Sequence, residues 1–320
     1  MSKKPPLIIL AGPTAVGKTE LSISLAKAIG GEIISCDSMQ VYKYMDIGSA
    51  KIRPEEMDGI RHYLVDELLP DEEFHVARFV AMAKEAMAEI YERGHIPIAV
   101  GGTGFYIQAL LYDTDFSKED SDGKIRAELE AFAKAEGALA LHDRLRQVDP
   151  ASADAIHPNN IKRVIRALEY YRMHGKPISL HNQEQRQKES PYDFRYFVLN
   201  DDRENLYRRI DKRVDQMMEE GLLDEVDHLQ KMGYTKDMVS MQGLGYKELF
   251  DVLDGSCSLE EGIYRIKRDT RHFAKRQLTW FHSKPEVIWI NKADFSYDNA
   301  AILTYMIKIC KKKTRRIDQI

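Results

Sequence analysis

An apolar run that leads directly into a glycine-rich octapeptide constrains this chain more than any other feature. Residues 7–10 (LIIL) precede Gly12, Pro13, Thr14, Ala15, Val16, Gly17, Lys18 and Thr19, which match G-x-x-x-x-G-K-[ST] at every fixed position. Residues 20–29 carry apolar side chains at helical spacing. The sequence therefore predicts a buried strand, a phosphate-binding loop and a helix in direct succession.

The residue types in this loop suit a di- or triphosphate. Gly12 and Gly17 allow backbone N–H groups to turn toward an anion, and Lys18 adds a positive charge at the start of the helix. The Thr19 hydroxyl stands where Mg²⁺ would bridge phosphate oxygens. The alternative is an ordinary glycine-containing turn between strand and helix.

Composition narrows the class of protein. The 320 residues are 43% hydrophobic and 31% charged, which is ordinary for a globular protein with a real core and leaves room for two domains. No apolar run approaches the roughly 18 residues of a spanning helix. Cys36, Cys257 and Cys310 form no C-x-x-C pair. We expect a cytoplasmic protein that is neither exported nor bound in a membrane.

Two further loops follow predicted strands. Residues 32–36 lead to Asp37, which lies 19 residues after Lys18, and residues 96–100 lead to the turn Gly101–Gly104. Ligands bind at the carboxyl edge of an open parallel sheet, so both loops should open beside the phosphate loop. There Asp37 can accept a proton or merely cap the next turn. Thr103 offers a hydroxyl, although a glycine turn also serves tight packing.

The alternation of predicted strands and helices is interrupted between residues 113 and 192. Helical patterns cover residues 123–145, 151–156 and 161–174, and the polar tract 179–190 is expected to be mobile. Residues 194–199 and 286–290 return to strand character and should complete the parallel sheet. The predicted fold is an α/β, P-loop NTPase-like core (residues 1–112 and 193–320) with a helical insertion domain (113–192).

Basic side chains gather late in the chain. Residues 265–320 hold 14 Lys/Arg against 5 Asp/Glu, although the whole chain has a net charge of −4. Cations in the predicted helix 262–281 and at Lys162, Arg163 and Arg166 could bind nucleic-acid phosphates or form solvated helix faces. Arg209 and Arg213, four residues apart, suit a diphosphate, a phosphodiester or nearby acidic partners.

Two classes of nucleotide-driven protein fit poorly. An acidic residue at the end of the 96–100 strand, which a motor-type ATPase would place on its metal, is absent. Residues 291–294 spell the N-K-x-D of GTPases, but no switch motif lies on a strand between Lys18 and this segment.

Seven segments, in order, resemble the tRNA dimethylallyltransferase (isopentenyltransferase) family in its bacterial form. They are GPTAVGKT, DSMQVY, GGTGFY, HPNNIKRVIRALE, LYRRIDKRVDQM, QGLGYKEL and KRQLTWF, and they span residues 7–281. The resemblance implies transfer of a dimethylallyl group from dimethylallyl diphosphate to N6 of the adenosine 3′ of the anticodon in tRNA.

The resemblance also implies roles for individual residues. Asp37, Thr103 and Arg209 would act in catalysis, residues 12–19 would bind diphosphate, and Thr19 would hold Mg²⁺. Contacts with the tRNA anticodon stem-loop are implied for Asp37, Ser38, Met39, Gln40, Thr103, Arg126, Lys162, Arg163, Val164, Ile165, Arg166, Gln242, Gly243, Gly245, Lys275 and Arg276. A monomer is the default expectation.

Two other functions remain open on sequence grounds. A small-molecule or nucleoside kinase could use the same fold, but it would need a compact Arg-bearing lid in place of a long insertion and a basic C-terminal segment. A nucleotide-gated RNA-binding protein without chemistry would leave Asp37 dispensable.

Overall fold

The computed structural model describes residues 4–114 and 123–311. Its chain divides into two compact units, one of residues 1–111 with 191–320 and the other of residues 112–190. Among the described residues, no helix is long and apolar enough to cross a membrane.

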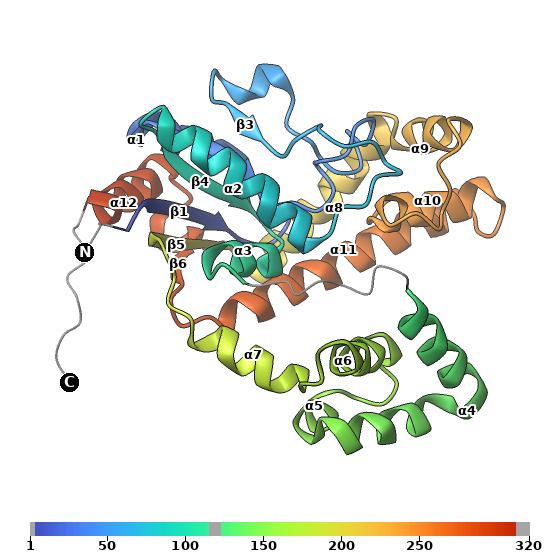
Figure 1. Cartoon of the computed structure of the whole chain (residues 1–320). Coiled ribbons are helices and arrows are strands. Elements are labelled where there is room, and N and C mark those ends of the chain that lie inside the picture. The colour runs from blue at the N-terminus through green and yellow to red at the C-terminus, as the bar shows by residue number, and fades with distance from the viewer. Residues whose placement is uncertain (1–3, 115–122, 312–320) are drawn as a thin grey trace. The chain divides into compact units, whose positions relative to one another are not determined.

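The first unit is built on a six-stranded parallel sheet with the strand order β3-β2-β4-β1-β5-β6 (Figure 1). The strands are β1 (Pro6–Ala11), β2 (Gly31–Ser35), β3 (His62–Tyr63), β4 (Ile96–Gly101), β5 (Asp193–Asn200) and β6 (Ile288–Asn291). The predicted α/β class is confirmed, and the two late strands do complete the sheet.

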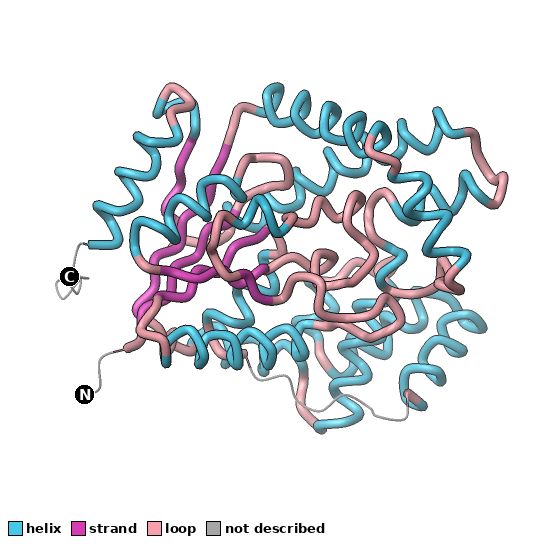
Figure 2. Tube along the Cα trace, turned by 90° about the horizontal axis from the view of Figure 1, so that it is seen from above, coloured by secondary structure: helices cyan, strands magenta, loops and turns pink. Residues whose placement is uncertain are grey.

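Helices of this unit lie on both sides of the sheet (Figure 2). They are α1 (Lys18–Ile29), α2 (Val76–Glu92), α3 (Gly104–Leu111), α8 (Arg203–Glu219), α9 (Leu222–Lys231), α10 (Tyr246–Leu253), α11 (Leu259–His282) and α12 (Asn299–Lys311), with short 3₁₀ turns at Pro54–Met57, Ser240–Gln242 and Lys292–Phe295. Alternate strand residues such as Ile8, Leu10 and Ile98 share one hydrophobic core with α1, α8 and α12. Helices α2 and α3 pack together and contact β4.

The second unit is helical and has its own core. It contains α4 (Lys124–Val148), which kinks at Gly137, α5 (Pro150–Ala155), α6 (Ile161–His174) and α7 (Ile178–Gln187). Buried Leu141, Leu145, Val164 and Leu168 join α4 to α6.

The polar tract at residues 179–190, which the sequence predicted to be mobile, is helical over most of its length. Residues 178–187 form α7, because Ile178 packs against the core of the unit and His181 lies 5.2 Å from the Tyr170 ring. Lys176 also forms an ion pair with Glu184, at 2.6 Å. The polar composition hid these contacts, which depend on the neighbouring helix α6.

A buried carboxylate ties together the amino-terminal ends of β2 and β4. Glu32 is 6% exposed, and it accepts hydrogen bonds from Arg93 Nε at 3.0 Å and from Tyr63 Oη at 3.0 Å. It also contacts His95 Nδ1, at 2.6 Å. Burial opposes ionisation of Glu32, but the hydrogen bonds outweigh it and lower its pKa to about 2.

This pKa predicts a pH-dependent contribution to folding. Because the folded-state pKa lies below the usual value near 4.5, the ionised Glu32 should stabilise the fold by roughly 3 kcal/mol at neutral pH, and this is lost as pH falls from about 4.5 toward about 2. Urea unfolding of Glu32→Gln and the wild type across this range should show a stability gap that narrows with acid. A gap that stays constant with pH would contradict the assignment.

Candidate active site

Three loops meet at the carboxyl edge of the sheet because β4 lies between β1 and β2. Ala11 pairs with Gly101, and Ser35 pairs with Val100, so the three strands end in register. Thr103 N donates to Cys36 O at 3.3 Å. A Cβ on Gly101 would lie 2.4 Å from this same oxygen, so only glycine allows the approach. The phosphate loop, the segment after Cys36 and the Thr103 turn are thereby brought together.

Glycine is required at both ends of the phosphate loop. Gly12 has φ of 152°, and a Cβ there would lie 2.7 Å from Leu199 O on the neighbouring strand. Gly17, with φ of 97° and ψ of 35°, is the N-cap of α1, so the loop turns directly into the helix. The positive end of the α1 dipole therefore faces the loop.

Side chains from separate elements hold the carbonyl groups of the loop. Lys18 Nζ donates to Gly12 O at 3.0 Å and to Pro13 O at 2.8 Å. Arg209 Nε, on α8, donates to Ala15 O at 2.7 Å. Engaged carbonyl groups fix the orientation of their planar peptides, and hence of the N–H groups on the other side of each bond.

Lys292 also contacts this loop, although the sequence analysis did not place it there. It directly follows β6 and is 7% exposed, and its Nζ lies 3.4 Å from Val16 O. A Cβ on Gly17 would lie 3.3 Å from both Lys292 Nζ and an Arg209 guanidinium nitrogen. The N-K-x-D segment, set aside as a GTPase signal, thus places a cation against the phosphate loop.

The site carries a concentration of positive charge. Burial, with the nearby Arg213 guanidinium, lowers the pKa of Lys18 to about 8, and Asp37 opposes this shift. Burial also lowers the pKa of Arg213, and the nearby Arg209 guanidinium lowers it further. The Asp37 carboxylate acts in the opposite direction and raises it. Within the described residues Arg213 forms no hydrogen bond or ion pair. Arg213 thus brings a positive charge near Lys18 and Asp37 that no described side chain pairs.

Asp37 makes a capping contact with one carboxylate oxygen only. Its Oδ1 accepts a hydrogen bond from Met39 N at 2.8 Å, which is a capping contact. No hydrogen bond to Oδ2 is formed in the part of the chain that the structure describes, and the Asp37 charge acts on Lys18 and Arg213. One oxygen thus fixes the carboxylate, and the other forms no hydrogen bond with the described residues.

Two hydroxyl groups at this edge are also uncommitted. Among residues 4–114 and 123–311, neither the Thr103 nor the Thr19 hydroxyl makes a hydrogen bond. Thr19 is exposed on the first turn of α1, next to Lys18. Described His, Cys, Asp and Glu residues form no group of three that could hold a metal. A Mg²⁺ ion here would take the Thr19 hydroxyl, substrate phosphates and water, which is its usual coordination at phosphate sites.

The residues expected to contact RNA fall into different environments. Gln40 donates to Ala50 O at 3.0 Å, and Gln242 donates to Lys236 O at 2.5 Å, so both amides hold local backbone. Gly243 packs against Met39, whose Cε would lie 2.5 Å from an added Cβ. Ser38 is partly exposed beside them, and Gly245 is the buried N-cap residue of α10.

Most of the basic side chains on α11 form ion pairs with acidic side chains. Its first part forms ion pairs, namely Arg265 with Glu261, Lys267 with Asp215, Arg268 with Asp269, and Arg271 with Asp211. Lys275 and Arg276 are exposed and form no ion pair with any described residue. Lys312, Lys313, Arg315 and Arg316, which contribute to the C-terminal charge, lie outside the described residues. The expected RNA-binding charge on α11 is therefore concentrated at Lys275 and Arg276.

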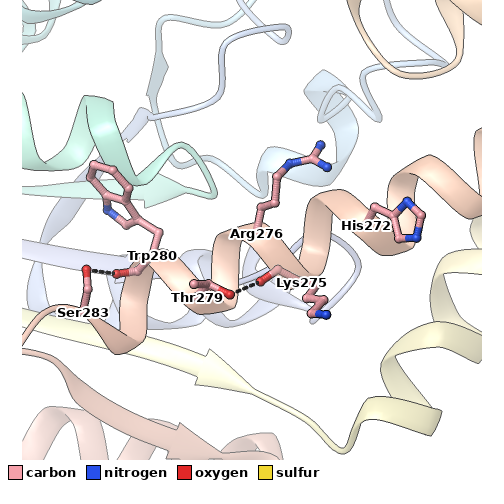
Figure 3. Close-up of a pocket in the computed structure, with 6 residues that line it drawn as sticks. All are labelled: His272, Lys275, Arg276, Thr279, Trp280 and Ser283. Atoms are coloured by element: carbon pink, nitrogen blue, oxygen red, sulfur yellow. Dashed lines mark hydrogen bonds between the residues drawn. The ribbon is translucent and has the colours of Figure 1, made fainter. Parts of the chain in front are cut away.

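These two cations border a hollow of about 550 Å³ on α11. It is lined by His272, Lys275, Arg276, Thr279, Trp280 and Ser283, and Figure 3 shows Arg276 and Trp280 extending from the same side of the helix. A Cβ on Gly104 would lie 2.2 Å from Trp280 Cδ1, so this indole packs against the Thr103 turn. An aromatic and cationic hollow thus adjoins the Thr103 turn.

In the helical unit, exposed cations and buried apolar residues alternate along α6. Lys162, Arg163 and Arg166 are exposed and unpaired among the described residues, whereas Arg126 pairs with Glu169 at 2.6 Å. Val164 and Ile165 are 0% and 2% exposed in the core of the unit. Their expected contact with RNA stays a prediction, and with these side chains buried it would have to use their backbone.

Comparison with known proteins identifies the family. The family model described as IPP transferase matches residues 40–284. A tRNA dimethylallyltransferase of Lachnoclostridium phytofermentans is 63% identical over 96% of this chain and 98% of its own length. The chain belongs to the tRNA dimethylallyltransferase family.

Other members of the tRNA dimethylallyltransferase family agree in sequence and fold. One from Acetivibrio thermocellus is 51% identical over 92% of this chain and 95% of its own length. The crystal structure of a tRNA isopentenylpyrophosphate transferase from Bacillus halodurans matches with a TM-score of 0.71 and 46% identity, covering 96% of each chain. A eukaryotic dimethylallyltransferase acting on tRNA matches with a TM-score of 0.83 and 32% identity, over 98% of this chain and 81% of that one. A kinase function has no support.

Proposed function

We propose that this chain transfers a dimethylallyl group from dimethylallyl diphosphate to N6 of the adenosine 3′ of the anticodon in tRNA, with release of diphosphate. The observation that carries the proposal is the meeting of the phosphate loop, Asp37 and Thr103 at one sheet edge, in a chain of this family. Transfer of label from dimethylallyl diphosphate to tRNA tests it.

Departure of the diphosphate is the first chemical requirement. The C1–O bond of the allylic substrate breaks with the electron pair on the departing oxygen, so negative charge develops on the diphosphate. Lys18, Arg213 and the N-terminus of α1 are already oriented around the loop, where they stabilise that charge. Arg209 holds Ala15 and faces the same loop. Mg²⁺ at Thr19 would supply further charge neutralisation.

The acceptor nitrogen is the second requirement. As the bond from N6 to C1 forms, the adenine amine must lose a proton, and it is too weakly basic to act without help. We assign the proton to Asp37 Oδ2, because Oδ1 is held by Met39 N. The Thr103 hydroxyl, on the adjoining turn, would bind an oxygen of the diphosphate.

Binding of the anticodon stem-loop is the third requirement. The adenosine must swing out of its stack to reach the sheet edge. Lys275 and Arg276 beside the hollow on α11, and Lys162, Arg163 and Arg166 on α6, are exposed cations suited to backbone phosphates. Trp280 gives the hollow an aromatic wall. We further propose a monomer that acts in the cytoplasm, where free cysteines such as Cys36 persist.

The lowered pKa of Lys18 predicts how substrate binding depends on pH. Lys18 must be protonated to attract the diphosphate, so its charge is lost as pH rises through about 8 in the free enzyme. The KM for dimethylallyl diphosphate should therefore increase above pH 8. In Lys18→Arg the charge persists at all these pH values, and KM should not show this rise. Steady-state kinetics from pH 7 to 9.5 checks both; an equal rise in the variant would contradict the role of Lys18.

Charge reversal on α6 should weaken tRNA binding. In Arg163→Glu/Arg166→Glu, we expect the slope of log affinity against log salt to become shallower by about 0.7 for each RNA phosphate that is no longer neutralised. Binding of diphosphate should be unchanged. Arg146→Glu, on α4, is the matched control because Arg146 already pairs with Asp154 at 2.8 Å. Filter binding of tRNA across a salt series measures this slope. A wild-type tRNA affinity that does not depend on salt would contradict the assignment of these cations to RNA phosphates.

A further inference from the structure

One buried side chain joins the phosphate loop to the Thr103 turn. Gln277, on α11, is 7% exposed. Its Oε1 accepts a hydrogen bond from Thr14 N at 2.9 Å, and its Nε2 donates to Gly102 O at 3.0 Å. A Cβ on Gly102 would lie 2.1 Å from this Nε2, so the amide lies directly against the turn.

The two contacts require a side chain that accepts one hydrogen bond and donates another, as glutamine does. Thr14 N can only donate, and Gly102 O can only accept, so the side chain between them must offer one acceptor and one donor. A glutamine amide has both on one planar group, and the two contacts fix which end is which. Ionised glutamate can only accept, and methionine lacks a donor, so neither replaces both bonds.

The two loops that Gln277 joins have separate tasks in the proposed reaction. The phosphate loop holds the leaving diphosphate, whereas Gly102 immediately precedes Thr103 and lies beside the Asp37 segment. The side chain comes from a third element, α11, whose neighbouring Lys275 and Arg276 are exposed. A helix that belongs to neither loop thus contacts both of them.

We propose that Gln277 is a positioning residue that holds the diphosphate site and the acceptor site in register for in-line transfer. The proposal rests on the proposed function, because it assigns Gln277 to that same transfer. Reacting atoms must approach to about 3–3.5 Å, and a misplacement of about 1 Å can cost about 10²-fold in rate. Loss of the two Gln277 hydrogen bonds should therefore reduce turnover and leave binding of each substrate largely intact.

The test compares Gln277→Met and Gln277→Glu with the wild type in single-turnover assays at saturating dimethylallyl diphosphate and tRNA. We expect the rate to fall by about 10- to 100-fold in both variants at neutral pH, with tRNA and diphosphate affinities within about twofold of the wild type. The matched control is Tyr63→Phe, which loses a buried hydrogen bond to Glu32 at the opposite edge of the sheet. It should lose a comparable amount of thermal stability and keep its rate.

Gln277→Glu adds a readout that a merely structural role would not produce. A protonated carboxyl group has one donor and one acceptor and can restore both bonds, whereas the ionised group can restore only the bond in which it accepts. The rate of this variant relative to the wild type should therefore recover as pH falls and this carboxyl group becomes protonated. In a Thr103→Val background, the effect of Gln277→Met should shrink, because the two residues act on one step.

The outcomes separate the two proposals. A folded Gln277→Met or Gln277→Glu enzyme with wild-type rate, or a loss of rate explained entirely by weaker binding, overturns the role of Gln277. A relative rate of Gln277→Glu that does not change with pH also counts against it. If Gln277→Met does not fold, Gln277→Glu and its pH profile decide. Failure of the wild type to prenylate tRNA would instead overturn the proposed function.

Discussion

Asp37→Asn should lower kcat by about 10²- to 10⁴-fold, or roughly 3 to 5 kcal/mol of barrier, because a positioned base contributes that much to proton transfer. The asparagine oxygen can still accept the hydrogen bond from Met39 N, so the local turn should persist. Binding of tRNA and diphosphate should therefore survive while the chemical step fails. A single-turnover assay with both substrates saturating measures that step alone.

Asp58→Asn is the matched control for this substitution. Asp58 is exposed and pairs with Lys27, on the surface of the same unit, so its loss should not affect the rate. The opposite pattern in Asp37→Asn, with weakened tRNA binding and a nearly normal single-turnover rate, would make Asp37 a structural cap.

Lys18→Ala should abolish measurable turnover, with kcat/KM for dimethylallyl diphosphate falling by at least about 10²- to 10³-fold. The substitution removes a cation from the diphosphate and also frees Gly12 O and Pro13 O, so both charge and loop geometry are disturbed. Binding of tRNA should remain mostly intact. Lys27→Ala, at the far end of α1, controls for loss of a surface cation and should be active.

The same variant tests what the phosphate loop does. If the loop serves a diphosphate leaving group, ATP can act at most as a competitor of dimethylallyl diphosphate, and Lys18→Ala should abolish that competition. Stoichiometric ATP hydrolysis during prenyl transfer would show that the loop drives a different step.

The parts of the site that the sequence predicted well are local in the chain. The octapeptide 12–19 fixes its own turn, because Gly12 and Gly17 adopt φ values that other residues avoid. The strands that precede Asp37 and Thr103 are apolar runs whose carboxyl ends share an edge in a parallel sheet. These features depend on residue type and short spacing, whereas the direct contact of the three loops depends on the position of β4 between β1 and β2.

The parts that the sequence did not predict depend on long-range packing. Lys292 reaches the phosphate loop only because β6 follows β5 and β1 in the sheet, an order that no local pattern encodes. Gln277 is likewise separated by 263 positions in the chain from the Thr14 that it holds. The ion pairs along α11 involve Asp211 and Asp215 of another helix, so composition overestimated the free charge on that face.

The central claim is tested most directly by incubating the protein with labelled dimethylallyl diphosphate, Mg²⁺ and tRNA lacking the modification, with ATP in place of the allylic substrate as the control. After digestion to nucleosides, the account predicts label on N6 of the adenosine 3′ of the anticodon, one diphosphate released for each transfer, and no requirement for ATP. Unlabelled tRNA in the first reaction, with phosphoryl transfer from ATP in the control, would contradict it.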